Sequence, residues 1–133
     1  MSAQPAGYSG KPLWRKLGIK PGMRVLPVNP PDHYDDLIDG AEGMEEVVSG
    51  PAEIVHLFCD ARADLDAGFG LALAQVAPGG MLWVSWPKKS SKRFIDLTED
   101  QLREVILPTG WVDVKVCAVD ADWSGLKFLK RKS

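Results

Sequence analysis

The chain has 133 residues, a hydrophobic content of 45% and a formal net charge of −2 at pH 7, values that suit one folded domain. Its sequence pI near 5.6 argues against general nucleic-acid binding, because such proteins usually carry a strongly basic face. No run approaches the roughly 18 continuous apolar residues of a membrane span, and the N-terminus lacks a signal-peptide core. We therefore expect no membrane association and a cytoplasmic location.

Secondary-structure signals alternate along the chain, with apolar spacing, caps and Gly/Pro turns marking the boundaries. Residues 1–10 carry few apolar side chains and are expected to form a flexible N-terminus, followed by a single domain over residues 11–130. The expected elements are a helix over 11–18, a strand over 23–28, a brief helix between Asp32 and Gly40, a weak strand over 45–49, a strand over 53–59, a long helix from Asp60 to before Pro78, a strand over 81–86, a helix capped by Thr98, and paired strands over 112–119 and 123–129.

The strand from Met81 to Trp86 organises this pattern. Nearly every residue in it is apolar without clean alternation, which is typical of a strand covered on both faces in a parallel sheet. Strands and helices alternate over residues 23–110 and end in a hairpin. The order predicts a three-layer, Rossmann-like α/β fold with a mostly parallel sheet, right-handed crossovers and a C-terminal antiparallel hairpin at the sheet edge.

A basic loop follows the central strand, at the edge of the sheet where ligands bind in open parallel sheets. Lys88, Lys89, Ser90 and Ser91 offer ammonium groups, hydroxyls and loop amides that suit a phosphate or carboxylate. A solvated loop with surface lysines is the equal alternative, because the loop lacks the glycines of a phosphate-binding P-loop. A small anionic ligand is the partner that this loop predicts.

Three further residues are candidates for the same ligand site. Asn29 and Asp60 end two predicted strands and are expected to face one crevice, although helix capping explains Asp60 and turn formation explains Asn29. Trp83 and Trp86 are three residues apart, so on a strand they face opposite sides of the sheet. Trp86 is the better candidate for stacking on a ligand ring, with core packing as the alternative for both.

No catalytic or metal-binding constellation emerges from the sequence. His33 and His56 are isolated, with neither a nucleophile partner nor ligand-type spacing to a cysteine. Cys59 and Cys117 lie in apolar runs, and two buried free thiols are expected rather than a disulfide. We therefore expect no catalytic residues and no metal site.

Two strings resemble class I methyltransferases. Leu17-Gly-Ile-Lys-Pro-Gly-Met-Arg-Val-Leu26 is similar to the lead-in to that family's first strand, and Val76-Ala-Pro-Gly-Gly-Met-Leu-Trp-Val84 to its turn into a late strand. The resemblance implies a methyltransferase-like fold and S-adenosylmethionine as cofactor. The departure is Pro27-Val-Asn-Pro-Pro31, which has no glycine where the family has a glycine-rich loop and no amide donors at its prolines.

The chain also resembles a family of short bacterial proteins of unassigned function. The residues that carry this resemblance are Tyr8-Ser-Gly-Lys-Pro-Leu-Trp14, Lys16-Leu-Gly-Ile-Lys-Pro-Gly22, Trp83-Val-Ser-Trp-Pro-Lys-Lys-Ser-Ser91, Val112-Asp-Val-Lys-Val-Cys-Ala-Val-Asp120 and Trp123-Ser-Gly-Leu-Lys127. The resemblance implies a methyltransferase-like domain with no established activity.

The sequence therefore favours a non-catalytic protein with a degenerate methyltransferase-like fold that binds a small molecule or anion, or regulates another protein, and that needs no cofactor. One alternative is an S-adenosylmethionine-dependent methyltransferase with an atypical cofactor loop. The other is a structural or interaction subunit that contacts a protein partner or a second copy through the hairpin edge over residues 112–129 or through the basic N-terminal segment.

Overall fold

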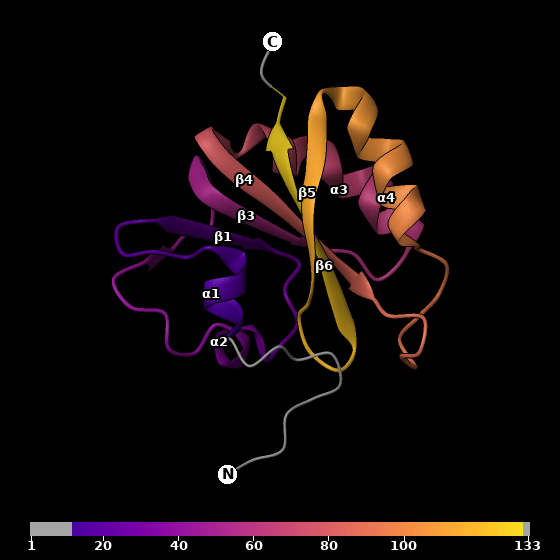
Figure 1. The fold of residues 1–133 in the computed structure, drawn as a ribbon, viewed down its shortest axis with the longest axis horizontal. Coiled ribbons are helices and arrows are strands. Elements are labelled where there is room, and N and C mark those ends of the chain that lie inside the picture. Colours follow the sequence, from indigo (N-terminus) through magenta and orange to yellow (C-terminus); the bar gives the residue numbers. More distant parts are fainter. Residues whose placement is uncertain (1–11, 132–133) are drawn as a thin grey trace.

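The computed structural model describes residues 12–131 and shows a six-stranded sheet with helices on both faces (Figure 1). Its elements in chain order are α1 (Leu13–Leu17), β1 (Arg24–Val28), α2 (Tyr34–Leu37), β2 (Glu45–Glu46), β3 (Ala52–Phe58), α3 (Arg62–Ala74), β4 (Val76–Pro87), α4 (Glu99–Ile106), the 3₁₀ helix η1 (Leu107–Thr109), β5 (Trp111–Ala118) and β6 (Trp123–Lys130). The α/β class and the element order expected from the sequence are confirmed.

The sheet is mixed, with strand order β2-β1-β3-β4-β6-β5. Strands β2, β1, β3 and β4 pair in parallel, whereas β6 pairs antiparallel with both β4 and β5. The expectation of a mostly parallel sheet is therefore right only for one part of it. The short turn between β5 and β6 allows these two strands to pair only antiparallel. Strand β6 is inserted between β5 and β4 and runs antiparallel to both of them. The C-terminal hairpin at the sheet edge is confirmed.

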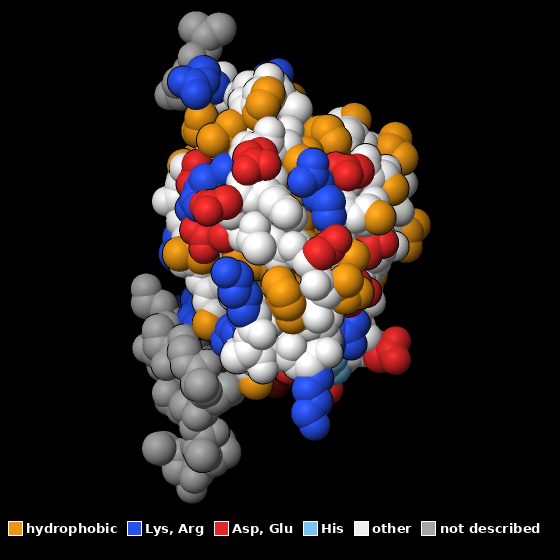
Figure 2. Space-filling view, turned by 90° about the vertical axis from the view of Figure 1, so that its right-hand side faces the viewer, with side chains coloured by type: hydrophobic (Ala, Val, Ile, Leu, Met, Phe, Trp, Pro, Cys, Tyr) orange, Lys and Arg blue, Asp and Glu red, His pale blue; other side chains and the backbone are white. Residues whose placement is uncertain are grey.

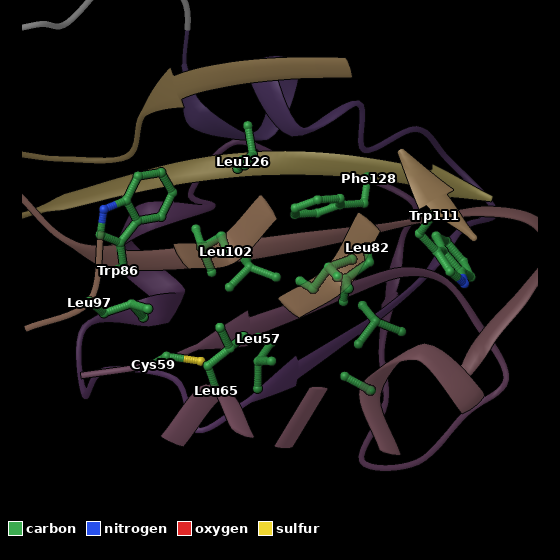
Figure 3. Close-up of a cluster of buried hydrophobic side chains, with 14 of the residues drawn as sticks. Leu57, Cys59, Leu65, Leu82, Trp86, Leu97, Leu102, Trp111, Leu126 and Phe128 are labelled. Carbon is green, nitrogen blue, oxygen red and sulfur yellow. The ribbon is translucent and has the colours of Figure 1, made fainter. Parts of the chain in front are cut away.

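Each face of the sheet carries its own apolar core. On one face, residues of β3, β4 and β6 pack against Leu65 of α3 and Leu102 of α4, as Figure 3 shows. On the other face, Leu13 and Leu17 of α1 and Tyr34 of α2 cover the sheet. The three layers expected from the sequence are thus present.

The two tryptophans of β4 confirm that this strand is buried on both sides. Trp83 lies in the core beneath α1 and donates from Nε1 to the Leu17 carbonyl at 3.0 Å. Trp86 lies in the opposite core with Leu126 and Leu97 (Figure 3). Their opposite orientation follows from the period-two geometry of a strand.

Three local expectations differ from the structure. The N-cap of α2 is His33 instead of Asp32, and the N-cap of α3 is Ala61 instead of Asp60, with Asp64 Oδ2 accepting the N–H groups of Asp60 and Ala61 at 3.1 and 3.0 Å. The central strand begins at Val76, before the expected start at Met81, because Val76 already pairs with β3. The cap at Thr98 is confirmed, since its side chain accepts from Gln101 N at 3.3 Å.

The expected flexible segment over residues 1–10 lies outside the described residues. Cys59 and Cys117 are both free thiols, the first buried and the second half-buried. Within residues 12–131, no group of three or more His, Cys, Asp or Glu side chains is arranged to hold a metal ion. No helix among those residues has the length and apolarity to cross a membrane.

Replacing a buried and an exposed leucine of α3 tests how this helix packs on the sheet. Leu65 is fully buried, whereas Leu71 is 72% exposed. We expect Leu65→Ala to lower the free energy of unfolding by about 2–5 kcal/mol, because it leaves a cavity in the core. Leu71→Ala is expected to change it by less than about 0.5 kcal/mol. Urea denaturation measures both, and equal losses would contradict the placement of α3.

Candidate functional site

The carboxyl ends of β1 and β3 lie side by side where the strand order reverses. From β1 the chain crosses to β2 on one side, and from β3 it crosses to β4 on the other. In open α/β sheets, ligands bind in the crevice outside the strand ends at such a switch point. Asn29 follows β1 and Asp60 lies two residues after β3, so the sheet brings these two predicted site residues to the same crevice.

Asn29 takes the backbone conformation that glycine usually supplies. Its φ is 54°, and it is the one non-glycine residue with positive φ in the described chain. Asparagine tolerates this left-handed region better than most residues, because its short polar side chain can bond locally. The tight turn after β1 is therefore formed without the glycines whose absence the sequence suggested as disqualifying.

A polar pocket of about 310 Å³ opens at this crevice and is lined by Asn29, Pro30, Pro31, Asp32, His33, Asp60, Arg93 and Trp123. Arg93 Nη2 donates to Asp60 Oδ1 at 2.7 Å, and both side chains are about half exposed. The Arg93 guanidinium also lies 5.0 Å from the centroid of the Trp123 ring, a cation–π arrangement. Asp60 therefore pairs with a cation across the pocket instead of capping α3.

A second, more apolar pocket of about 510 Å³ lies between β1, the segment after β2 and α3. Its walls are Leu26, Pro27, Val28, Asn29, Val48, Ser49, Asp64, Ala67, Gly68, Leu71, Ala72 and Gln75. Asn29 lines this pocket and the polar one. The crevice thus offers an apolar chamber and a charged chamber on either side of one residue.

A buried polar network supports the loop that carries Asn29. His56 Nε2 lies 2.6 Å from Ser85 Oγ, and His56 Nδ1 lies 3.1 Å from the Tyr34 hydroxyl. Burial lowers the pKa of His56 to about 3 and raises the pKa of Tyr34, so the imidazole and the phenol are both neutral. One imidazole nitrogen donates and the other accepts, which anchors Tyr34 at the start of α2, next to the crevice loop.

The predicted site residues separate into two places. Asn29 and Asp60 lie at the crevice, whereas Trp86, Lys88 and Lys89 line a different pocket of about 410 Å³ together with Thr98, Glu99, Asp100 and Ser124. Ser90 is exposed outside both linings. Ser91 Oγ donates to Asp122 Oδ1 at 2.9 Å and accepts from Arg93 N at 3.0 Å, which shapes the loop.

The stacking role expected for Trp86 does not fit the structure. Its side chain is 6% exposed and its ring packs within the core, so no ring face is open to a ligand. Conversely, sequence reasoning missed Arg93 and Trp123, which line the crevice. Arg93 lies two residues after Ser91, at the end of the basic loop, but no local signal in the sequence shows that it reaches Asp60, 33 residues away.

The surface near α4 carries charges of both signs. In Figure 2, Lys and Arg side chains lie among Asp and Glu side chains on the face shown, with hydrophobic side chains between them. Arg103, for example, pairs with Glu99 at 2.5 Å and with Asp113 at 2.9 Å. This face therefore presents no broad basic patch among the described residues.

The sequence matches no protein-family model, and a search of curated proteins finds no significant relative. The resemblance to a short bacterial family is thus without support, but the fold has similar solved structures. A structure described as a DhpI–SAH complex has 12% sequence identity and a TM-score of 0.58, covering 92% of this chain and 83% of that chain. The ribosomal protein L11 methylase from Lactobacillus delbrueckii subsp. bulgaricus has 10% identity and a TM-score of 0.57, covering 89% and 74%.

A putative methyltransferase from Thermoplasma acidophilum is also similar, with 12% identity and a TM-score of 0.54, covering 100% of this chain and 85% of that chain. These similarities establish a methyltransferase-like fold. They also contradict two expectations, namely that the protein is not an enzyme and that it needs no cofactor, since two of the similar structures are described as a methylase and a putative methyltransferase and the third as a complex with SAH. The glycine-free loop favours the opposite expectation only where positive φ requires glycine, and Asn29 adopts positive φ without it.

The buried imidazole makes a prediction about acid stability. In the folded protein burial holds the pKa of His56 near 3, whereas an unfolded histidine titrates near about 6.5. The unfolded chain binds more protons between these values, so the free energy of unfolding falls as the pH falls through this window. We expect His56→Gln to flatten that dependence in urea denaturation. The same change at exposed His33 is the control, and an unaltered slope for His56→Gln would contradict the neutral imidazole.

The left-handed turn after β1 makes a second prediction. Asn29→Ala keeps the β-carbon but removes the short polar side chain whose local hydrogen bonding makes the left-handed conformation tolerable, so it is expected to lower the free energy of unfolding by about 1 kcal/mol. Asn29→Gly is expected to change it less, because glycine adopts positive φ freely. Equal losses in the two variants, measured by urea denaturation, would show that the backbone conformation is not what asparagine contributes.

Proposed function

We propose that this chain is an S-adenosylmethionine-dependent methyltransferase with an atypical cofactor loop. The observation that carries the proposal is the crevice at the reversal of strand order, where two pockets of about 510 and 310 Å³ share Asn29. Both volumes lie in the range of about 300–1,000 Å³ that small-molecule sites occupy. The methyltransferase-like fold supports the same assignment.

The chemistry of the two chambers fits the two ends of the cofactor. The larger chamber is mostly apolar, with Ser49 and Gln75 at its walls, and suits an adenosyl group that needs a few polar contacts. The smaller chamber holds a carboxylate on Asp60 and a guanidinium on Arg93. These groups are complementary to the ammonium and carboxylate of an amino-acid end, and arginine binds carboxylates well.

The loop after β1 contributes less backbone hydrogen bonding than a glycine-rich loop. Pro30 and Pro31 have no N–H to donate, so binding depends on side chains instead. Asn29, which is exposed at the junction of the chambers, offers an amide that both donates and accepts. In the proposed site, the side chains of Asn29, Asp60 and Arg93 make the contacts that backbone N–H groups make in a glycine-rich loop.

When bound, the cofactor supplies a methyl group on a positively charged sulfonium. The carboxylate of Asp60 favours positive charge in the small chamber, and the apolar walls of the large chamber suit the adenosyl group. His56 is unsuited as a proton acceptor for the reaction, since it is fully buried and already bonded to Tyr34 and Ser85. The chain's contribution is therefore to bind and orient reactants, an effect that by itself supports large rate increases.

Calorimetric titration with S-adenosylmethionine and S-adenosylhomocysteine tests this proposal. We expect micromolar binding by the native chain. Ala67 is exposed and lines the apolar pocket, so Ala67→Trp is expected to fill it and abolish binding. The matched control is Ala63→Trp, because Ala63 is exposed on the same helix outside that lining. Arg93→Ala is expected to weaken binding about tenfold or more, as loss of a charged hydrogen bond does.

Absence of binding by the native chain at millimolar concentrations of both compounds would overturn the proposal. Equal weakening by the two tryptophan variants would show that the apolar pocket is not the site. Circular dichroism of each variant separates a loss of binding from a loss of folding.

A further inference from the structure

The pocket beside α4 lies on the other side of the sheet from the polar pocket at the crevice. Its wall residue Trp86 belongs to the core under α3 and α4, whereas Trp123 of the crevice belongs to the core under α1 and α2. We propose that this second pocket, about 410 Å³ in volume, binds the carboxylate or phosphate group of a small molecule. The inference does not depend on the proposed methyltransferase function.

The indole N–H of Trp86 is the first observation that points to a ligand. The side chain is 94% buried, being 6% exposed, with its ring fixed between apolar neighbours (Figure 3). Within residues 12–131 its Nε1 donates to no protein acceptor, and Trp86 lines the pocket. The N–H therefore borders the pocket as a donor, and buried polar groups of this kind ordinarily have an acceptor.

The positive charge at the pocket comes from the loop after β4. Lys88 and Lys89 both line it, and Lys89 is exposed. The two acidic residues of the lining, Glu99 and Asp100, direct their carboxylates at Arg103, with distances of 2.5 and 3.5 Å. Arg103 also pairs with Asp113, so three carboxylates share its single positive charge. The exposed Lys89 is the cation that the loop presents to an occupant of the pocket.

The remaining polar groups of the pocket also donate. The pocket reaches the first turn of α4, where the side chain of the N-cap Thr98 accepts from Gln101. The backbone N–H groups of Glu99 and Asp100 have no carbonyl of their own helix to bond, as for every helix start, and this end carries the positive side of the helix dipole. Ser124 adds a hydroxyl.

A cluster of donors around one indole N–H requires acceptor oxygens from its ligand. Carboxylate and phosphate groups provide these oxygens together with the negative charge that the lysines favour. The donors therefore bind the anionic group of the ligand. The rest of the small molecule extends toward the open side of the pocket.

The test titrates ¹⁵N-labelled protein separately with inorganic phosphate and with acetate, with sodium chloride holding the ionic strength constant. The indole N–H resonance of Trp86 is assigned by its loss in Trp86→Phe. We expect a saturable shift of that resonance. Lys89→Ala is expected to weaken affinity about three- to fivefold, the effect of one exposed charge, and Lys92→Ala to leave it unchanged, because Lys92 lies on the same loop outside the lining. Trp86→Phe is expected to weaken affinity about tenfold, measured by calorimetry.

Saturation by phosphate alone or by acetate alone supports the proposal and identifies which anion the pocket prefers. A resonance that neither anion moves would overturn it, as would equal weakening by Lys89→Ala and Lys92→Ala, which would indicate attraction to the loop as a whole. If Trp86→Phe does not fold, the two lysine variants decide the question in the calorimeter.

Discussion

The pairing of β3 with β4 is the constraint on which the rest of this structure depends. Residues Ile54–Phe58 lie in register with Met81–Ser85 at the centre of the sheet, and almost all of these side chains are buried. Apolar side chains on both faces must be removed from water, so α1 and α2 cover one face and α3 and α4 the other. The two polar side chains in this pairing, His56 and Ser85, bond to each other at 2.6 Å, which satisfies groups that would otherwise be costly to bury. With both faces covered, functional groups are left to the strand ends.

The loop after β1 at the crevice adopts the left-handed backbone conformation without the glycine that usually provides it. Asn29 turns the chain at positive φ without glycine. Tyr34, held by the neutral His56, fixes the segment that follows. The loss of backbone donors at Pro30 and Pro31 is a real difference from a glycine-rich loop, and it transfers the task of binding to Asp60, Arg93 and Asn29.

The loop between β4 and α4 connects the two proposed sites. Its first part places Lys89 at the pocket beside Trp86, and its later part places Arg93 against Asp60 and Trp123. A hydrogen bond from Lys88 N to the Asp122 carbonyl, at 2.8 Å, and one from Ser91 to the Asp122 carboxylate hold the loop against the turn between β5 and β6. One loop therefore supplies a cation to each pocket.

Elements whose signals are local could be predicted from the amino-acid sequence. The apolar run of β4, the helix start at Thr98, the left-handed glycine at Gly18 that ends α1, and the C-terminal hairpin could all be predicted, because each depends on residues a few positions apart. The sequence also placed Asn29 and Asp60 at one crevice, since strand ends meet by topology. The tertiary structure alone decided that Arg93 reaches Asp60, that Trp86 is a core residue with its N–H at a pocket, and that Lys89 and Arg93 serve different pockets. These contacts join residues far apart in the chain, and their geometry depends on strand register and packing, which no short stretch of sequence encodes.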